Sequence, residues 1–187
     1  MSQAKKKYKY LPGDPIPKDN IASMIRVNHA GELGAVVIYK GQQAALKNSN
    51  LYDKLVEMEI HEREHFDYFD NQISERNIRP SFLYNIWKKM GFMLGYVSGK
   101  LSEKSAMTCT MAIENNIERH YAEQIETLSN INIYQELLDN IIQFREDELE
   151  HRDIAVECDA KESKIFYPVY YSVSLISKIS IFIAKKI

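Results

Sequence analysis

The sequence predicts an all-α protein built as a bundle of long helices. Glycine and proline are sparse, with 7 and 5 among 187 residues, so few positions break a helix. Apolar residues recur at spacings of three and four, and strand-like alternation never extends beyond a few residues. A chain of this length can bury the core of a single domain.

The first predicted helix follows an irregular N-terminal segment. Three prolines and a glycine between residues 12 and 17 interrupt regular structure, and several lysines make the segment basic. It has neither the apolar run of a secretory signal nor the Arg and Ser enrichment of an organelle transit peptide. Residues 1–18 are therefore predicted to be a flexible tail, and Asp19 is the candidate N-cap of the first helix.

The remaining helices are separated by residues that favour turns or N-caps. Breaks at 48–50, 77–80 and 130–132 end the first, second and fourth helices, and Ser81 and Ser102 are candidate N-caps of the third and fourth. The predicted helices cover residues 19–47, 51–77, 81–99, 102–129, 132–158 and 165–185.

The order of these helices predicts an internal repeat within one domain, residues 19–187. Residues 19–77 and 102–158 each form a two-helix hairpin. The helix at 81–99 can serve as the long crossover between the hairpins, and the helix at 165–185 is an addition at the C-terminus.

Composition excludes several classes of function. The net charge of −2 gives no general attraction to nucleic acid, and no nucleic-acid-binding motif occurs. Cys109 and Cys158 lie far apart and match no metal or redox spacing. Their isolation fits a reducing compartment and no disulfide framework.

The most informative pattern is a duplicated set of Glu and His residues. A Glu in a charge-poor stretch is followed by Glu-x-x-His, first after 30 residues and again, in the second half of the chain, after 34. The six residues are Glu32, Glu62, His65, Glu114, Glu148 and His151. A bundle with one Glu on each of two helices and Glu-x-x-His on each of the other two binds a di-iron or di-manganese centre.

Periodicity predicts that all six residues face the core. They continue the apolar stripes of their helices, and they lie at similar distances from the turns that join each hairpin. Four buried carboxylates without partners would each cost several kcal/mol. Two divalent cations would balance their four negative charges, and mixed imidazole and carboxylate ligation suits iron or manganese.

Two other interpretations of these residues have less support. A single Glu-x-x-His is common on exposed helices, where its charges pair with Arg and Lys, but its duplication at matched depth argues against that. Residues 61–65 also spell the His-Glu-x-x-His motif of zinc proteases. The second copy has Asp147 in place of the first His, and His61 falls off the core stripe, so His61 is predicted to be dispensable.

Longer motifs give the chain a family resemblance. From about residue 21 to the C-terminus it resembles the demethoxyubiquinone hydroxylases, di-iron monooxygenases of ubiquinone biosynthesis with a ferritin-like four-helix bundle. Asn28 and Leu33 depart from the Asp and Tyr of many relatives. The matching segments are 26–35, 38–39, 41–42, 79–80, 87, 91–92, 94–95, 106–110, 114, 120–121 and 144–151.

The resemblance implies an enzyme that adds one hydroxyl group to the ring of a polyprenyl demethoxyubiquinol, a 3-demethoxyubiquinol 3-hydroxylase. It uses two iron ions, dioxygen and an external electron donor that the sequence does not identify. It implies that Glu32, Glu62 and His65 bind one iron and that Glu114, Glu148 and His151 bind the other, with Glu62 and Glu148 bridging. His120 and Tyr121 are candidates for outer hydrogen bonding, or for electron and proton delivery.

A substrate with an isoprenoid tail implies contact with a lipid bilayer. The segment 82–97 is apolar, but two lysines interrupt it, which suits a helix that lies in the membrane interface. The segment 165–183 is apolar too, but Pro168, Lys178 and four serines argue against a span. We therefore expect peripheral attachment to the cytoplasmic face of a bacterial inner membrane, or to the matrix face of a mitochondrial one. A homo-oligomer or a complex of ubiquinone-biosynthesis proteins is an expected assembly.

Two functions from other classes use the same features. A ferritin- or rubrerythrin-like iron oxidase would share the metal ligands, and iron stoichiometry would separate it from a hydroxylase. A purely structural or membrane-binding helical bundle would bind no metal. The resemblance favours the hydroxylase.

Overall fold

The computed structural model describes residues 17–130 and 134–185, with side chains from residue 21 onward, so most of the predicted tail lies outside it. The described residues form six α-helices, one 3₁₀ turn and no strand, which confirms the all-α prediction. The helices are α1 (Pro17–Ala45), α2 (Tyr52–Glu75), α3 (Tyr84–Leu101), α4 (Glu103–Ser129), α5 (Gln135–Glu157) and α6 (Phe166–Ala184), with η1 (Ala160–Glu162) before α6.

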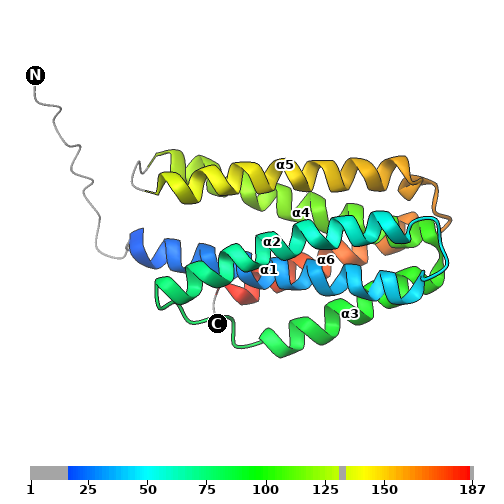
Figure 1. Cartoon of the computed structure of the whole chain (residues 1–187), viewed down its shortest axis with the longest axis horizontal. Coiled ribbons are helices and arrows are strands. Elements are labelled where there is room, and N and C mark those ends of the chain that lie inside the picture. Colours follow the sequence, from blue (N-terminus) through cyan, green and yellow to red (C-terminus); the bar gives the residue numbers. More distant parts are fainter. Residues whose placement is uncertain (1–16, 131–133, 186–187) are drawn as a thin grey trace, which may run out of the picture.

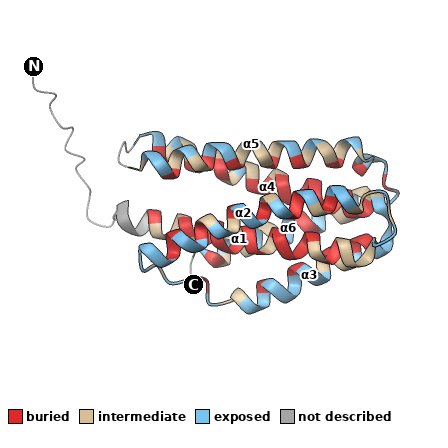
Figure 2. Cartoon of the chain, viewed as in Figure 1, coloured by how far each residue is buried: buried red, intermediate tan, exposed pale blue. Residues whose placement is uncertain are grey.

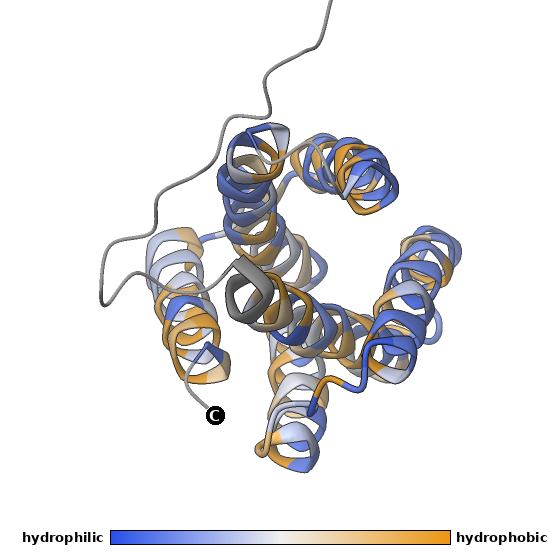
Figure 3. Cartoon of the chain, turned by 90° about the vertical axis from the view of Figure 1, so that its left-hand side faces the viewer, coloured by the Kyte–Doolittle hydropathy of each residue, from blue (hydrophilic) through white to orange (hydrophobic). Residues whose placement is uncertain are grey.

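The helices pack as a bundle with two additions. The hairpins α1–α2 and α4–α5 lie alongside each other and contribute the four helices of the central bundle (Figure 1). Helix α3 runs along α1 and links the two hairpins, while α6 packs mainly on α4. An end-on view shows the helices grouped around a common axis (Figure 3).

The core is formed by the inward faces of the four bundle helices (Figure 2). Four large side chains have no exposed surface: Ile25 on α1, Leu55 and Phe69 on α2, and Ile141 on α5. Burial of a side chain of this size contributes roughly 1.5–3 kcal/mol. These contacts fix the positions of the helices that carry the candidate ligands.

Glycine allows α3 to lie directly against α1. A Cβ atom at Gly95 would be 1.9 Å from the carbonyl oxygen of Ile38, and one at Gly41 would be 2.2 Å from the carbonyl oxygen of Phe92. Both contacts are with backbone, which cannot move aside as a flexible side chain can. Any larger residue at these positions would therefore push α3 away from the bundle.

The helix ends agree with the sequence only in part. Ser102 caps α4 as predicted, because its side chain accepts a hydrogen bond from the amide of Ser105. The prediction for Ser81 is wrong: α3 begins three residues later, and the Ser81 hydroxyl instead accepts from the Trp87 indole at 3.2 Å. Helix α1 begins at Pro17, so Asp19 lies within its first turn and is not the N-cap.

Candidate metal centre

The six predicted ligand residues project from the four bundle helices into one shared space. They are Glu32 on α1, Glu62 and His65 on α2, Glu114 on α4, and Glu148 and His151 on α5. Each is at most 2% exposed. Ordinary surface helices would leave such residues in water, so this burial is incompatible with the surface interpretation.

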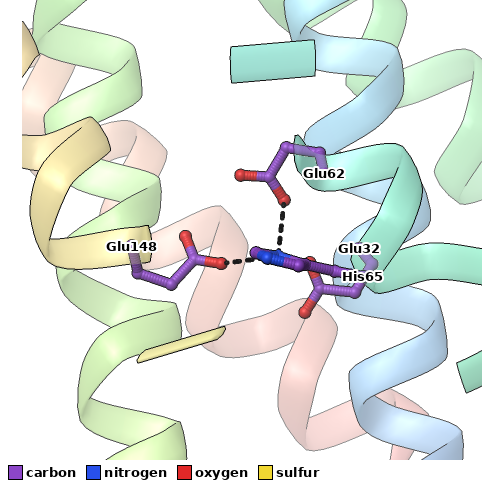
Figure 4. A group of neighbouring side chains, drawn as sticks. All are labelled: Glu32, Glu62, His65 and Glu148. Atoms are coloured by element: carbon purple, nitrogen blue, oxygen red, sulfur yellow. Dashed lines mark ion pairs between the residues drawn. The ribbon is translucent and has the colours of Figure 1, made fainter. Parts of the chain in front are cut away.

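The ligand atoms form two overlapping groups, each with its atoms within 4.8 Å of one another. Glu32 and His65 belong to the first group, Glu114 and His151 to the second, and Glu62 and Glu148 to both. In the first group, His65 Nδ1 lies 3.4 Å from Glu148 Oε1 and 3.8 Å from Glu62 Oε2 (Figure 4). In the second, His151 Nδ1 lies 3.0 Å from Glu62 Oε1.

Unpartnered ligand atoms show that these residues fit a metal pair. Buried atoms with no hydrogen-bond partner include one oxygen each of Glu32, Glu62 and Glu114, both oxygens of Glu148, and Nδ1 of His65. A buried carboxylate without a partner is costly, and buried charges are normally paired or coordinate metals. Five of the six residues therefore have a buried oxygen or nitrogen atom that lacks a hydrogen-bond partner and that could ligate a cation in the shared space.

The electrostatics of the metal-free site are those of crowded carboxylates. Burial raises the pKa values of Glu62 and Glu148 well above their usual range, and the neighbouring carboxylates raise them further. Burial alone would lower the pKa of His65, but the hydrogen bond to Asp147 and the nearby carboxylates of Glu32 and Glu62 outweigh it and raise that pKa to about 10. Without metal, protons are therefore held where cations would bind.

Two buried tyrosines orient Glu32 and Glu114, the two carboxylates that belong to only one ligand group each. Tyr121 on α4 donates its hydroxyl hydrogen to Glu32 on α1, and Tyr39 on α1 donates to Glu114 on α4. Each tyrosine lies seven residues after the Glu of its own helix, but it contacts the Glu of the other helix. The family resemblance indicated Tyr121 but not Tyr39, although the equal spacing in the two halves of the chain could have identified Tyr39.

Each candidate histidine ligand has its Nδ1 against the carboxylates, and its other ring nitrogen, Nε2 (the outer nitrogen), contacts a further side chain. His65 Nε2 lies 3.0 Å from Asp147 Oδ2, and His151 Nε2 lies 3.2 Å from His61 Nδ1. His61, predicted from the sequence to lie off the core stripe, belongs to neither ligand group, but its ring reaches His151. The zinc-protease interpretation needed His61 and His65 as joint ligands, and the geometry does not group them.

His120 is partly buried beside the site and forms no hydrogen bond with any of the six residues. Its Nδ1 lies 4.0 Å from the exposed Glu123, and its Nε2 is buried without a partner. Burial lowers the pKa of His120 to about 4, helped by the charge of Lys185, so its ring is neutral at physiological pH. It differs in this from Tyr121, which contacts Glu32 directly.

An apolar cavity of about 430 Å³ leads to one end of the site. Helices α1, α3, α4 and α6 line it, mostly with aliphatic side chains such as Ile38, Leu94 and Ile113. Glu32, His120 and Tyr121 supply polar groups on its wall. The cavity therefore joins an apolar binding space to the first ligand group.

Comparison with known proteins identifies the family. The family model described as "Ubiquinone biosynthesis protein COQ7" matches residues 19–184. This chain belongs to the COQ7 family. The match covers all four bundle helices almost completely and includes all six candidate ligands.

Individual COQ7-family relatives match over most of their length. The chain is 38% identical over 175 residues to "NADPH-dependent 3-demethoxyubiquinone 3-hydroxylase, mitochondrial" of Dictyostelium discoideum, covering 93% of this chain and 81% of the relative. It is 38% identical over 178 residues to "3-demethoxyubiquinol 3-hydroxylase" of Rhodospirillum rubrum, covering 95% and 83%. It is 34% identical over 176 residues to the human protein with the same name as the Dictyostelium one, covering 93% and 81%.

Proposed function

We propose that this protein is a 3-demethoxyubiquinol 3-hydroxylase, which adds one oxygen atom from dioxygen to the quinol ring at a carboxylate-bridged di-iron centre. The observation that carries the proposal is the position of the buried Glu and His set, at the inner end of an apolar cavity. The names of the relatives support the choice of substrate.

Iron is proposed for both metal positions. Glu32 and His65 would hold one ion, Glu114 and His151 the other, and Glu62 and Glu148 would bridge them, since these two residues belong to both groups. When bound, the iron pair supplies the redox chemistry that activates dioxygen. Manganese has similar ligand preferences, so the choice of iron rests on the family.

The chain itself binds and orients the quinol. Aliphatic walls suit an isoprenoid tail and exclude water, while the polar groups near Glu32 mark the end where a ring with hydroxyl groups would lie. The Tyr121 hydroxyl holds the Glu32 carboxylate in place, and the neutral His120 can accept a hydrogen bond from a quinol hydroxyl at its unprotonated ring nitrogen. One ring C–H, one dioxygen, two electrons and two protons give one C–OH and one water.

We expect the iron-loaded protein to convert a short-chain demethoxyubiquinol to a product that is heavier by one oxygen atom. Several relatives are named as NADPH-dependent, so NADPH is the first reductant to supply. Mass spectrometry with isotopically labelled dioxygen should show one labelled atom in the product, and metal-free protein is the control. Absence of labelled product with two irons bound per chain would refute the proposal, as would an iron load far above two, which is typical of a store.

Peripheral attachment to an inner membrane is part of the proposal. Helix α6 is the one described helix that is long and apolar enough to cross a membrane by length and composition, and 11% of its apolar 18-residue window is buried. It is nevertheless tied to the bundle, because Asn116 donates to the carbonyl and hydroxyl oxygens of Ser174 at 3.2 and 3.1 Å. Attachment through one face of α6 agrees with these contacts better than a span does.

Two exposed apolar stripes flank the mouth of the cavity. On α3 the stripe contains Ile86, Met90, Met93, Val97 and Leu101, and on α6 it contains Tyr167, Tyr171, Leu175, Ile179 and Phe182. Met90, Met93 and Val97 also line the cavity itself. Exposed apolar stripes of this kind are typical of helices that lie in a bilayer interface. A quinol could then pass from lipid into the cavity without crossing water.

We expect Leu175→Glu and Phe182→Glu to reduce binding to phospholipid vesicles by about tenfold each, because each removes an apolar side chain worth roughly 1.5 kcal/mol or more in lipid. Both residues are more than half exposed and lie outside the cavity lining. Ile60→Glu on α2 makes the same change at a residue that is 48% exposed, far from α6 in the sequence, and should leave binding unchanged. Equal loss in all three variants, measured by co-sedimentation, would contradict attachment through α6.

A further inference from the structure

His61 lies between the candidate ligands and the surface of the bundle. It precedes Glu62 on α2, is partly buried, and belongs to neither ligand group. Its ring lies nearly parallel to that of His151 from α5, with centroids 5.4 Å apart and an angle of 17° between the planes. Its Nδ1 lies 3.2 Å from His151 Nε2, within hydrogen-bond distance.

The contact has a counterpart at the other histidine. Asp147 precedes Glu148 on α5 and reaches His65 Nε2 on α2 at 3.0 Å. The residue before each Glu of the repeated motif therefore holds the outer nitrogen of the histidine on the opposite helix. The two partners differ chemically, because one is a carboxylate and the other is an imidazole.

We propose that His61 is the positioning residue for His151, and that it fixes the tautomer in which His151 carries its proton on Nε2 and presents Nδ1 to Glu62, Glu114 and Glu148. This inference rests on the proposed function only in that a metal occupies the second ligand group. A histidine that ligates through one nitrogen needs its other N–H bonded, and such a partner fixes the orientation of the ring. His61 Nδ1 accepts that hydrogen when its own proton is on Nε2.

The two metal positions should consequently be unequal. Asp147 is an anionic acceptor and makes the His65 imidazole more basic, whereas His61 offers His151 a weaker acceptor. We expect two distinct binding steps for a divalent metal, with the weaker step at the group that contains His151. Loss of the His61 acceptor should weaken that step alone.

The test uses anaerobic titration of the full-length metal-free protein with Co²⁺, which accepts the same ligand types as Fe²⁺ and reports each step by its visible absorption. We expect His61→Ala to weaken one of the two steps by about 10- to 100-fold and to leave the other unchanged. His61→Gln should restore most of the loss, since its amide oxygen can accept the His151 N–H. Glu64→Gln, at an exposed position on the same helix, is the matched control.

A double-mutant cycle separates positioning from a general structural role. In the His151→Ala background, His61→Ala should cause no further loss of Co²⁺ affinity, because His61 acts only through His151. Unchanged affinity at both steps in His61→Ala would overturn the proposal, and so would equal weakening of both steps or additive losses in the double variant. The Co²⁺ titration does not measure hydroxylation, so it tests the role of His61 even if the protein does not catalyse the proposed reaction.

Discussion

Replacing Glu148 with alanine is expected to lower the rate of hydroxylation by more than about 100-fold. Mutation of a residue that only hydrogen-bonds to a metal ligand already lowers metal affinity or activity by about 10- to 100-fold, and loss of a ligand itself should cost more. Glu148 belongs to both ligand groups, and both of its oxygens are buried without a hydrogen-bond partner. Its removal takes a donor from each metal position at once. Iron per chain should fall below two, measured by colorimetric assay, together with product measured by mass spectrometry.

Glu146→Ala is the matched control, because Glu146 lies two residues away on α5 and is exposed. It should retain two irons and nearly full turnover. A second variant, Glu148→Gln, keeps the volume of the side chain and removes its charge, so loss of iron in this variant cannot be attributed to a cavity. Near-normal iron content and turnover in both Glu148 variants would exclude Glu148 as a bridging ligand.

The fold could be predicted from the sequence because its signals are local. The spacing of apolar residues and the scarcity of Gly and Pro identified six helices, and all six are present among the described residues. Helix ends were harder to predict, because a serine that could cap a helix can also bond elsewhere. Ser81 bonds to Trp87, whereas Ser102 caps α4, and the difference depends on the packing of Trp87 against the bundle.

The part of the site that could be predicted from the sequence is the direction of each side chain, because the apolar periodicity of a single helix determines which residues face the core. Glu62 and His65 follow the core stripe of α2, so their inward direction was visible in the sequence. Contacts between helices were not visible, because they depend on how the helices are rotated about their axes. For that reason three contacts emerged only from the structure: Tyr39 with Glu114, His61 with His151, and Asp147 with His65.

One departure from the family pattern also finds its explanation in such a contact. Asn28, where the family resemblance leads us to expect Asp, exchanges two hydrogen bonds with Gln124, at 2.8 and 2.6 Å. A carboxylate at this position could accept from the Gln124 amide but could not donate to its oxygen. The buried amide pair thus stabilises α1 against α4 beside the cavity, without an added charge.

We expect the metal-free protein to lose stability as the pH rises from 6.5 to about 9, while the metal-loaded protein keeps it. Glu62 and Glu148 have raised pKa values in the metal-free fold, so the native state holds protons there that the unfolded chain has released. His65, with its pKa raised to about 10, likewise contributes stability that is complete below 6.5 and is lost toward pH 10. All three groups make the native state bind more protons, so the free energy of unfolding falls with rising pH.

If the native state holds one more proton than the unfolded chain, the free energy of unfolding falls by about 1.4 kcal/mol per pH unit, or by about 3 kcal/mol between pH 6.5 and about 9. Urea unfolding of chelator-treated protein, with and without Co²⁺, would measure it. Below pH 6.5 the slope should flatten or reverse, because burial lowers the pKa values of His29, His120 and His151 and these rings resist protonation in the fold.

Glu148→Gln distinguishes this account from a general effect of alkali. It removes one carboxylate that holds a proton, so the free energy of unfolding of the metal-free variant should fall less steeply above pH 6.5 than that of the parent. Co²⁺ should also raise its free energy of unfolding by less. Glu146→Gln, at an exposed residue, should behave as the parent does. An unchanged slope in Glu148→Gln would mean that the buried carboxylates do not set the pH dependence. The expected result follows from one physical cause: carboxylates crowded away from water destabilise the fold unless protons or cations neutralise them, and above neutral pH only cations remain.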